Sequence, residues 1–393
     1  MNEVSKGISI GIVEPIGGHG GNELYDFGLC KALAEEGYKV TLYTCDETHI
    51  DEQFAFPFTV KKLFVKIYGK ANKYIRGIRF LLGLRKVLAD IDKQQCKLVH
   101  MHFYHFSNIE YIMLLLFTNK RVKVVGTVHD VETFDKYGKE IDKKKYQKFE
   151  KLLSHIIVHT SYAKESLLKY FSNISPDAIN IVPHGDTDFL YSTTLTKIEA
   201  RKKLGLPEGK NIVLFFGQIK RVKGLEVLLY AFAKLLKQKQ DVHLVVAGNP
   251  WKHDMVDVYD IINAEKLAHN GTFIFDYIPN DHVPLYFRAA DIVALPYLKI
   301  YSSGVLLRSM SYGSCIIASD TDAFKTVIKD GYNGLVFKTG DDDDLAAKIK
   351  LLLDNKGLRD TMTANAKKTI EEKFSWKVVG QKTSEVYQKA LQS

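Results

Sequence analysis

The sequence predicts an α/β protein made of two doubly wound domains, each a parallel sheet covered by helices. Short apolar runs typical of buried strands alternate with amphipathic stretches along the chain, and this rhythm stops and restarts near residue 200. A chain of 393 residues is also long for a single hydrophobic core. We therefore expect two domains of similar size that face each other, joined by a linker at 186–209.

The first half opens with an apolar run at Ile8–Val13, which predicts a buried strand. A glycine-rich turn follows and leads into an amphipathic helix over Asn22–Glu36, which Gly37 ends as a C-cap. The later strands of this half are expected at Lys39–Thr44, Leu98–His102, Val122–His129, Ile156–Thr160 and Ile181–Pro183.

The second half repeats the same pattern. After a short polar helix at Lys197–Leu204, a strand at Asn211–Phe216 leads through a turn into a helix at Gly224–Leu236. Further strands are expected at Val242–Val246, Thr272–Phe275, Ile292–Leu295, Cys315–Ala318 and Leu335–Phe337.

The composition excludes several classes of protein. Hydrophobic residues make up 46% of the chain and aromatic residues 11%, as in packed globular proteins rather than disordered ones. The apolar run Ile8–Ile12 is short for a signal peptide, and Tyr111–Phe117 is far below the roughly 18 residues that span a bilayer. We expect a cytoplasmic protein, which also suits four scattered cysteines: Cys30, Cys45, Cys96 and Cys315.

The net charge of +9 is concentrated in one segment. Residues 61–97 contain eleven Lys or Arg residues and two Asp residues, interleaved with apolar side chains. A basic amphipathic stretch of this kind is typical of contact with an anionic membrane surface, here the inner face of the plasma membrane. A solvated helix face is the alternative. We expect no nucleic acid partner, because no nucleic-acid-binding module is recognisable.

Ligands of doubly wound sheets bind where strands end and helices begin. The first such turn is Gly17-Gly18-His19-Gly20-Gly21, whose glycines allow close approach of backbone to a ligand at a helix N-terminus. A tight turn without a ligand is the alternative. A nicotinamide dinucleotide is disfavoured, because Glu23 takes the place of the third glycine in G-x-G-x-x-G.

Two further turns of this kind lie in the second half. Gly217–Gly224 carries three cations, Lys220, Arg221 and Lys223, before a helix. Tyr301–Val305 presents small residues at the start of another helix. Cations and helix-terminal N–H groups both favour anions, so the two turns predict one nucleoside diphosphate bound between them. Solvated surface lysines are the alternative.

The order of motifs resembles glycosyltransferase family 4, whose members have the GT-B fold of two facing Rossmann-like domains and retain the configuration at the anomeric carbon. The resemblance covers nearly the whole chain. The matching motifs are Gly20-Gly21 with Gly37–Val40, Leu98–His102, Val125–Asp130, Val182–Gly185, Ala290–Pro296, Gly331–Asp341, and Phe374-Ser375-Trp376 with Tyr387.

The resemblance implies a division of labour between the domains. Residues 1–185, with a C-terminal crossover helix at 375–393, would bind the acceptor, and residues 210–374 would bind the nucleotide sugar. The reaction would be transfer, without a cofactor, from a UDP- or GDP-linked sugar to a glycan or polyprenyl-linked acceptor, in the assembly of cell-surface polysaccharide or glycolipid.

The resemblance also assigns roles to residues. His129 would contact the donor sugar, and Lys220 and Lys223 would stabilise the leaving diphosphate; a purely structural role is the alternative for His129. Gly18, His19 and His102 would lie on the acceptor side. The implied donor site comprises Gly20, Gly21, Gly217, Gln218, Gly248, Tyr277, Ile278, Ser302, Ser303, Gly304, Val305 and Arg308.

The chain departs from the family where donor contacts are expected. The paired glutamates of E-x7-E are replaced by Ile300 and Arg308, a further glutamate by Thr326, and the arginine of the phosphate loop by Gln218. Arg308 only donates hydrogen bonds. It can therefore bind a phosphate or a sugar carboxylate, but it cannot accept hydrogen bonds from the ribose hydroxyls. A catalytically impaired partner subunit is therefore the alternative function. The motif order disfavours a 2-epimerase or a phosphorylase.

We expect no metal site. Asp341–Asp344 opens a predicted helix, where carboxylates commonly interact with the helix dipole. His100 and His102 share one face of a predicted strand and His105 follows, but zinc would need a fourth ligand that the sequence does not indicate.

Overall fold

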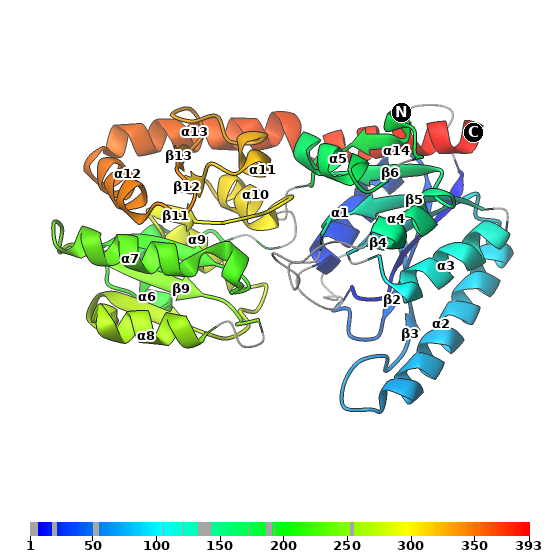
Figure 1. The fold of residues 1–393 in the computed structure, drawn as a ribbon, viewed down its shortest axis with the longest axis horizontal. Coiled ribbons are helices and arrows are strands. Elements are labelled where there is room, and N and C mark those ends of the chain that lie inside the picture. The colour runs from blue at the N-terminus through cyan, green and yellow to red at the C-terminus, as the bar shows by residue number, and fades with distance from the viewer. Residues whose placement is uncertain are drawn as a thin grey trace. The chain divides into compact units, whose positions relative to one another are not determined.

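The computed structural model describes residues 7–17, 22–49, 55–104, 106–120, 122–132, 143–171, 173–185, 191, 193–251 and 255–393. The chain divides into two compact units (Figure 1). Unit 1 comprises residues 1–185 and 374–393, and unit 2 comprises residues 186–373. Each unit is a parallel sheet with helices, so the predicted α/β fold class is confirmed.

Unit 1 contains a seven-stranded parallel sheet in the order β3-β2-β1-β4-β5-β6-β7. The sequence pattern missed β3 because it is an edge strand whose Lys61 and Lys62 break the apolar run. The strands are β1 (Ser9–Glu14), β2 (Lys39–Cys45), β3 (Thr59–Phe64), β4 (Leu98–Phe103), β5 (Lys123–Val128), β6 (His155–Val158) and β7 (Ile179–Ile181).

The helices of unit 1 include one that comes from the far end of the chain. This helix, α14, packs against α1, and the two together cover part of the unit 1 sheet. The helices are α1 (Asn22–Glu35), α2 (Lys73–Lys93), α3 (Asn108–Asn119), α4 (Lys143–Glu150), α5 (Ser161–Leu168) and α14 (Trp376–Gln392).

The indole of Trp376 occupies a niche that two glycines leave open. A Cβ atom at Gly28 would lie 2.0 Å from the indole, and one at Gly185 would lie 2.5 Å from it. Further along α14, the Tyr387 hydroxyl is 2.6 Å from His100 Nδ1. The C-terminal helix is thus built into unit 1 by close packing and by a buried hydrogen bond.

Unit 2 contains a six-stranded parallel sheet in the order β10-β9-β8-β11-β12-β13. Its strands are β8 (Asn211–Phe216), β9 (Val242–Ala247), β10 (Gly271–Ile274), β11 (Ile292–Leu295), β12 (Cys315–Ser319) and β13 (Leu335–Phe337). Its helices are α6 (Lys197–Lys203), α7 (Leu225–Leu236), α8 (Val256–Ala264), α9 (Val283–Ala289), α10 (Gly304–Ser311), α11 (Asp322–Lys325), α12 (Asp342–Asp354) and α13 (Lys356–Lys373).

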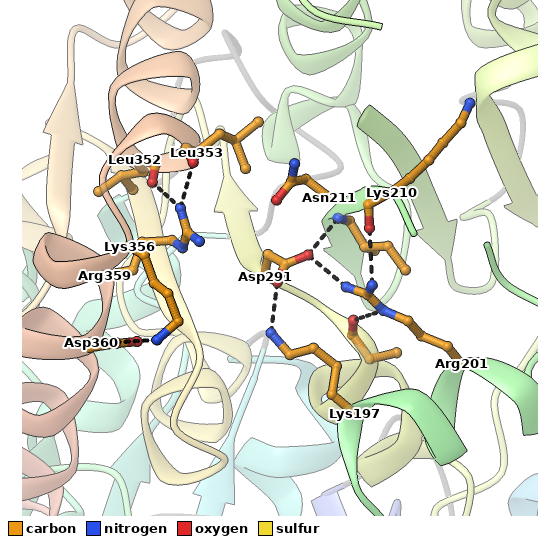
Figure 2. A network of polar contacts seen from close by, with 12 residues as sticks. Lys197, Arg201, Lys210, Asn211, Asp291, Leu352, Leu353, Lys356, Arg359 and Asp360 are labelled. Atoms are coloured by element: carbon orange, nitrogen blue, oxygen red, sulfur yellow. Dashed lines mark hydrogen bonds and ion pairs between the residues drawn. The ribbon is translucent and has the colours of Figure 1, made fainter. Parts of the chain in front are cut away.

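A network centred on Asp291 attaches α6 to the unit 2 sheet, so that part of the predicted linker groups with unit 2 (Figure 2). The carboxylate accepts hydrogen bonds from Arg201 Nη2 at 2.6 Å, Lys197 Nζ at 2.7 Å and the Ile212 N–H at 2.8 Å. Burial opposes ionisation of Asp291, but these partners outweigh it and lower its pKa. Arg201 also donates to the carbonyls of Glu208, Ala289 and Lys210.

Both sheets have the strand order of a doubly wound fold, in which the connections change direction between the first and the fourth strand. Ligands of such folds bind in the crevice at this switch point. The switch points lie between β1 and β4 in unit 1 and between β8 and β11 in unit 2. Among the helices in the described part of the chain, none has the length and hydropathy that crossing a membrane requires.

We predict that Gly28→Ala destabilises unit 1 by about 2 kcal/mol, because the added methyl group displaces the Trp376 indole from its niche. Urea denaturation followed by tryptophan fluorescence measures the loss. Gly77→Ala is the matched control on α2, where an added Cβ meets no atom within 4 Å and should stabilise the helix by up to about 1 kcal/mol. Equal changes in the free energy of unfolding for the two substitutions would show that the indole does not depend on the space left by Gly28.

Candidate functional site

Next to the switch point of unit 2, the loops that follow β8 and β9 meet through glycines. Gly217 follows β8 with a φ of +103°, a conformation that favours glycine. Gly248 follows β9, and a Cβ atom there would lie 2.0 Å from the Gly217 carbonyl oxygen. The backbones of the two loops therefore lie too close together for any residue with a side chain at position 248. Both glycines belong to the predicted donor site.

The structure brings the two predicted anion-binding turns together. A Cβ atom at Gly217 would lie 3.4 Å from Lys223 Nζ and 3.2 Å from Val305 Cγ2. The lysine turn and the serine–glycine turn, distant in sequence, thus meet beside Gly217. Two turns in this position can share one ligand.

Aromatic rings flank both lysines of the site. Lys220 Nζ lies 4.8 Å from the centre of the Trp251 ring, and Lys223 Nζ lies 5.2 Å from the centre of the Tyr297 ring. Cation–π contacts of this kind hold an ammonium group in place without neutralising its charge. Both ammonium groups are thus held against the loops of this site.

Helix α10 presents its N-terminus at the second turn. Ser303 is its N-cap, and its Oγ accepts a hydrogen bond from the Leu306 N–H at 3.2 Å. The first N–H groups of a helix, here those of Gly304 and Val305, have no partner within the helix and favour a negative charge. Ser302 and Arg308 are half-buried, on the turn and on α10 respectively.

The remaining predicted donor residues contribute less to this arrangement. Gln218 is half-buried beside Gly217. Tyr277 is 57% exposed. Its backbone N–H already donates a hydrogen bond to Oδ1 of the preceding residue, Asp276. Ile278 is buried, as is Ile300 at the position where the family has a glutamate.

In unit 1, three histidines form a chain across the carboxyl ends of β4, β5 and β6. His102 Nδ1 lies 3.4 Å from His129 Nε2, and His129 Nδ1 lies 3.3 Å from His159 Nε2. His159 Nδ1 lies 3.0 Å from the Val182 carbonyl oxygen, to which it must donate, so its Nε2 accepts from His129. The predicted Gly18, His19, Gly20 and Gly21 lie outside the described residues.

The aromatic surroundings of His129 keep it neutral. Its ring stacks on Tyr104 with centroids 4.8 Å apart and meets the edge of Tyr25 at 5.0 Å. Burial lowers the pKa of His129, and lowers that of His159 to about 3. A neutral imidazole donates through one nitrogen and accepts through the other, and both nitrogens of His129 are engaged within unit 1, Nδ1 by His159 and Nε2 by His102.

Two acidic residues that the sequence interpretation did not single out lie beside His102. Glu14 and Asp26 are each 1% exposed. Asp26 Oδ1 lies 3.3 Å and Glu14 Oε2 lies 3.6 Å from His102 Nδ1. Burial raises the pKa of both carboxyls. The sequence signal was weak, because Asp26 is marked only as a carboxylate within the otherwise largely apolar run Leu24–Cys30.

Other predicted polar groups have structural partners. Both ring nitrogens of His100 are occupied, Nδ1 by Tyr387 and Nε2 by Thr127 at 2.7 Å. Asp341 caps α12 by accepting from the Asp344 N–H at 3.1 Å, as expected for a helix start. Asp342 and Asp343 both pair with Lys234. His105 lies outside the described residues.

Two family descriptions match successive parts of the chain. Residues 19–189 match Glycosyltransferase Family 4, and residues 196–369 match Glycosyl transferases group 1. The chain belongs to the group 1, family 4 glycosyltransferases. The resemblance inferred from the motif order is therefore confirmed.

Relatives of this glycosyltransferase cover between about half and nearly all of its length. D-inositol 3-phosphate glycosyltransferase of Corynebacterium kroppenstedtii is 24% identical and covers 96% of this chain and 86% of its own. Phosphatidyl-myo-inositol mannosyltransferase of Mycolicibacterium smegmatis is 30% identical over 47% of this chain and 46% of its own. The solved structure of HepE from Anabaena with UDP and glucose superposes with a TM-score of 0.75 at 16% identity, over 97% and 99% of the two chains. This likeness shows the GT-B fold.

We predict that His100→Gln reduces the acid sensitivity of unit 1. Burial lowers the pKa of His100 to about 3. Below the ordinary value of about 6.5, only the unfolded state binds this proton, so stability present above pH 6.5 is lost as the pH falls towards 3. Between pH 6 and pH 4, the substitution should reduce the pH dependence of the unfolding free energy of unit 1 by about 1.4 kcal/mol per pH unit.

Urea denaturation at several pH values, read by pulsed hydrogen exchange, separates peptides of unit 1 from those of unit 2. The pH dependence of unit 2 should stay unchanged in the variant, which serves as the internal control. An unchanged slope in unit 1 would show that His100 is protonated in the folded protein.

Proposed function

We propose that this glycosyltransferase transfers a sugar from a nucleoside diphosphate donor to a glycan or lipid-linked acceptor, with retention at the anomeric carbon. The observation that carries the proposal is the meeting of Lys223, Gly217 and Val305 at the switch point of unit 2. This arrangement joins a cation, a glycine that admits a ligand and a helix N-terminus, the three features that bind a diphosphate.

The same groups account for leaving-group stabilisation. As the bond between sugar and diphosphate breaks, negative charge develops on the diphosphate. Lys220 and Lys223, held over Trp251 and Tyr297, and the N-terminus of α10 are already in place to stabilise that charge. The protein then supplies fixed electrostatic groups, and the leaving diphosphate itself can accept the acceptor's proton.

The relatives suggest the substrates. HepE was solved with UDP and glucose, which makes a UDP-linked sugar the first donor to test and a GDP-linked sugar the second. The names of two relatives specify inositol 3-phosphate and phosphatidyl-myo-inositol. Both are polar groups bearing hydroxyls and phosphate, and the second is part of a lipid. We assign the acceptor to unit 1, beside the neutral His129 and His102.

One helix of unit 1 supports a lipid-linked acceptor. Helix α2, the long cyan helix beside β3 in Figure 1, packs on the unit through Leu84, Val87 and Ile91. Its other face is apolar yet exposed. The exposed side chains follow helical spacing and are Tyr74 (70%), Ile75 (48%), Ile78 (59%), Leu81 (55%) and Leu82 (54%).

Cations border this exposed stripe, including Lys73, Arg85 and Lys86. An apolar stripe edged by cations is complementary to a bilayer with anionic headgroups, each cation near the surface contributing about 1 kcal/mol. We infer that α2 holds the enzyme at the inner face of a membrane, where a lipid-linked acceptor is presented.

A second candidate function rests on Ile300 and Arg308. Ile300 is buried where the family has a donor-binding glutamate, and Arg308 cannot accept hydrogen bonds from ribose. A chain with this donor site can serve as a partner subunit of an active glycosyltransferase. Turnover of a nucleotide sugar by the purified chain alone would show that the chain is an active enzyme rather than a partner subunit.

We predict that Lys223→Ala weakens UDP binding roughly 10- to 100-fold, the loss expected for a charge-assisted contact with phosphate. Calorimetric titration with UDP and GDP measures it, and crystals soaked with either nucleotide locate the phosphates. Lys237→Ala is the matched control, since Lys237 is an exposed lysine at the C-terminal end of α7 and should change affinity less than about threefold. Unchanged affinity in Lys223→Ala would contradict the proposed donor site.

We predict that Ile78→Glu combined with Leu81→Glu lowers binding to anionic vesicles at least tenfold, because both substitutions place carboxylates in the apolar stripe. Flotation with phosphatidylglycerol and with phosphatidylcholine vesicles measures binding. Leu351→Glu controls for the added charge, because Leu351 is a similarly exposed leucine (46%) in unit 2. Equal binding of the native chain to both vesicle types would argue against membrane docking.

A further inference from the structure

The switch point of unit 1 holds a compact group of potential metal ligands. Glu14 is the last residue of β1, His102 lies on β4, and Asp26 lies on α1. Their exposed fractions are 1%, 5% and 1%. One ligand atom from each lies within 4.8 Å of the others. The strand order thus brings together three residues from separate parts of the sequence.

The distances fit a small transition-metal ion. His102 Nδ1 is 3.3 Å from Asp26 Oδ1 and 3.6 Å from Glu14 Oε2. Tetrahedral zinc with bonds of about 2.0–2.1 Å separates its ligand atoms by about 3.3 Å. Both distances from His102 Nδ1 are close to that spacing. A bound ion takes the Nδ1 lone pair, so His102 would then carry its proton on Nε2 and give up its 3.4 Å contact with His129.

The carboxylates lack the partners that buried carboxylates normally have. Within the residues that the structure describes, Glu14 Oε2 and both carboxylate oxygens of Asp26 accept no hydrogen bond. In the described part of the chain, neither residue is paired with a lysine or an arginine, and the basic group beside them, His102, is one whose pKa burial lowers. Asp291, by contrast, is held by two cations and an N–H. Burying two carboxylates without compensation is costly, and either protons or a cation can relieve that cost.

We propose that Glu14, Asp26 and His102 form a binding site for a divalent transition-metal ion, with zinc as the best match. Imidazole favours zinc over magnesium or calcium, and the two harder ions need more oxygen ligands than the three residues supply. Three protein ligands leave a fourth position for water or for a substrate oxygen, as in reactive rather than purely structural zinc sites.

A neighbouring contact orients one ligand. Glu14 Oε1 accepts a hydrogen bond from the Ile16 N–H at 2.7 Å, which leaves Oε2 directed at His102. The group Asp341–Asp343, which is half-buried to exposed, also has metal-like spacing, but its carboxylates are engaged by Lys234 and by the start of α12. The buried group is therefore the one we assign to a metal.

The test is zinc binding by the full chain, measured by elemental analysis after dialysis and by competition with a chromogenic zinc chelator. We expect one zinc ion per chain, and at least tenfold weaker binding in Glu14→Gln, Asp26→Asn and His102→Gln. The double substitution Asp342→Asn with Asp343→Asn is the control and should leave the stoichiometry at one. Failure of the native chain to bind zinc at micromolar concentration overturns the proposal, as does full binding by the three folded variants.

Should the three variants fail to fold, X-ray absorption of the zinc-loaded native chain decides the question. A first shell of one nitrogen with oxygens supports the site, whereas sulfur or several nitrogens overturn it. The site lies in unit 1 and the proposed diphosphate site in unit 2, so zinc binding and nucleotide binding succeed or fail independently.

Discussion

Parallel strand pairing is the constraint on which both candidate sites depend. It places the carboxyl ends of seven strands at one edge of unit 1 and those of six strands at one edge of unit 2. Polar residues that follow unrelated strands are thereby gathered without any local sequence motif linking them. In unit 2 this edge collects a lysine turn and a helix N-terminus, and in unit 1 it collects three histidines and two carboxylates.

The two units handle buried charge in different ways. In unit 2, Asp291 is surrounded by donors, and its ionised form holds α6 on the sheet. In unit 1, Glu14 and Asp26 are buried beside histidines whose own pKa values burial lowers, so neither group readily supplies the other with a permanent countercharge. The first arrangement suits a structural role, and the second suits binding of something that brings charge with it.

Much of this could be predicted from the sequence, because apolar runs and glycine turns are local signals. The lysine turn was recognisable since Lys220 and Lys223 lie directly between a strand and a helix. Their meeting with Val305 followed only from the position of both turns at strand ends. The link from Asp26 to His102 was not predictable, since it depends on β4 lying beside β1, and the edge strand β3 was missed because lysines interrupt its pattern.

The Trp376 niche has a consequence for how the molecule is made. Because α14 belongs to unit 1 but follows unit 2 in the chain, unit 2 is in effect an insertion within unit 1. During synthesis, unit 2 can complete its sheet before the Trp376 indole has been made and can fill the niche at Gly28 and Gly185. Unit 1 therefore begins translation first but receives the last helix of its fold only after the whole of unit 2 has been synthesised.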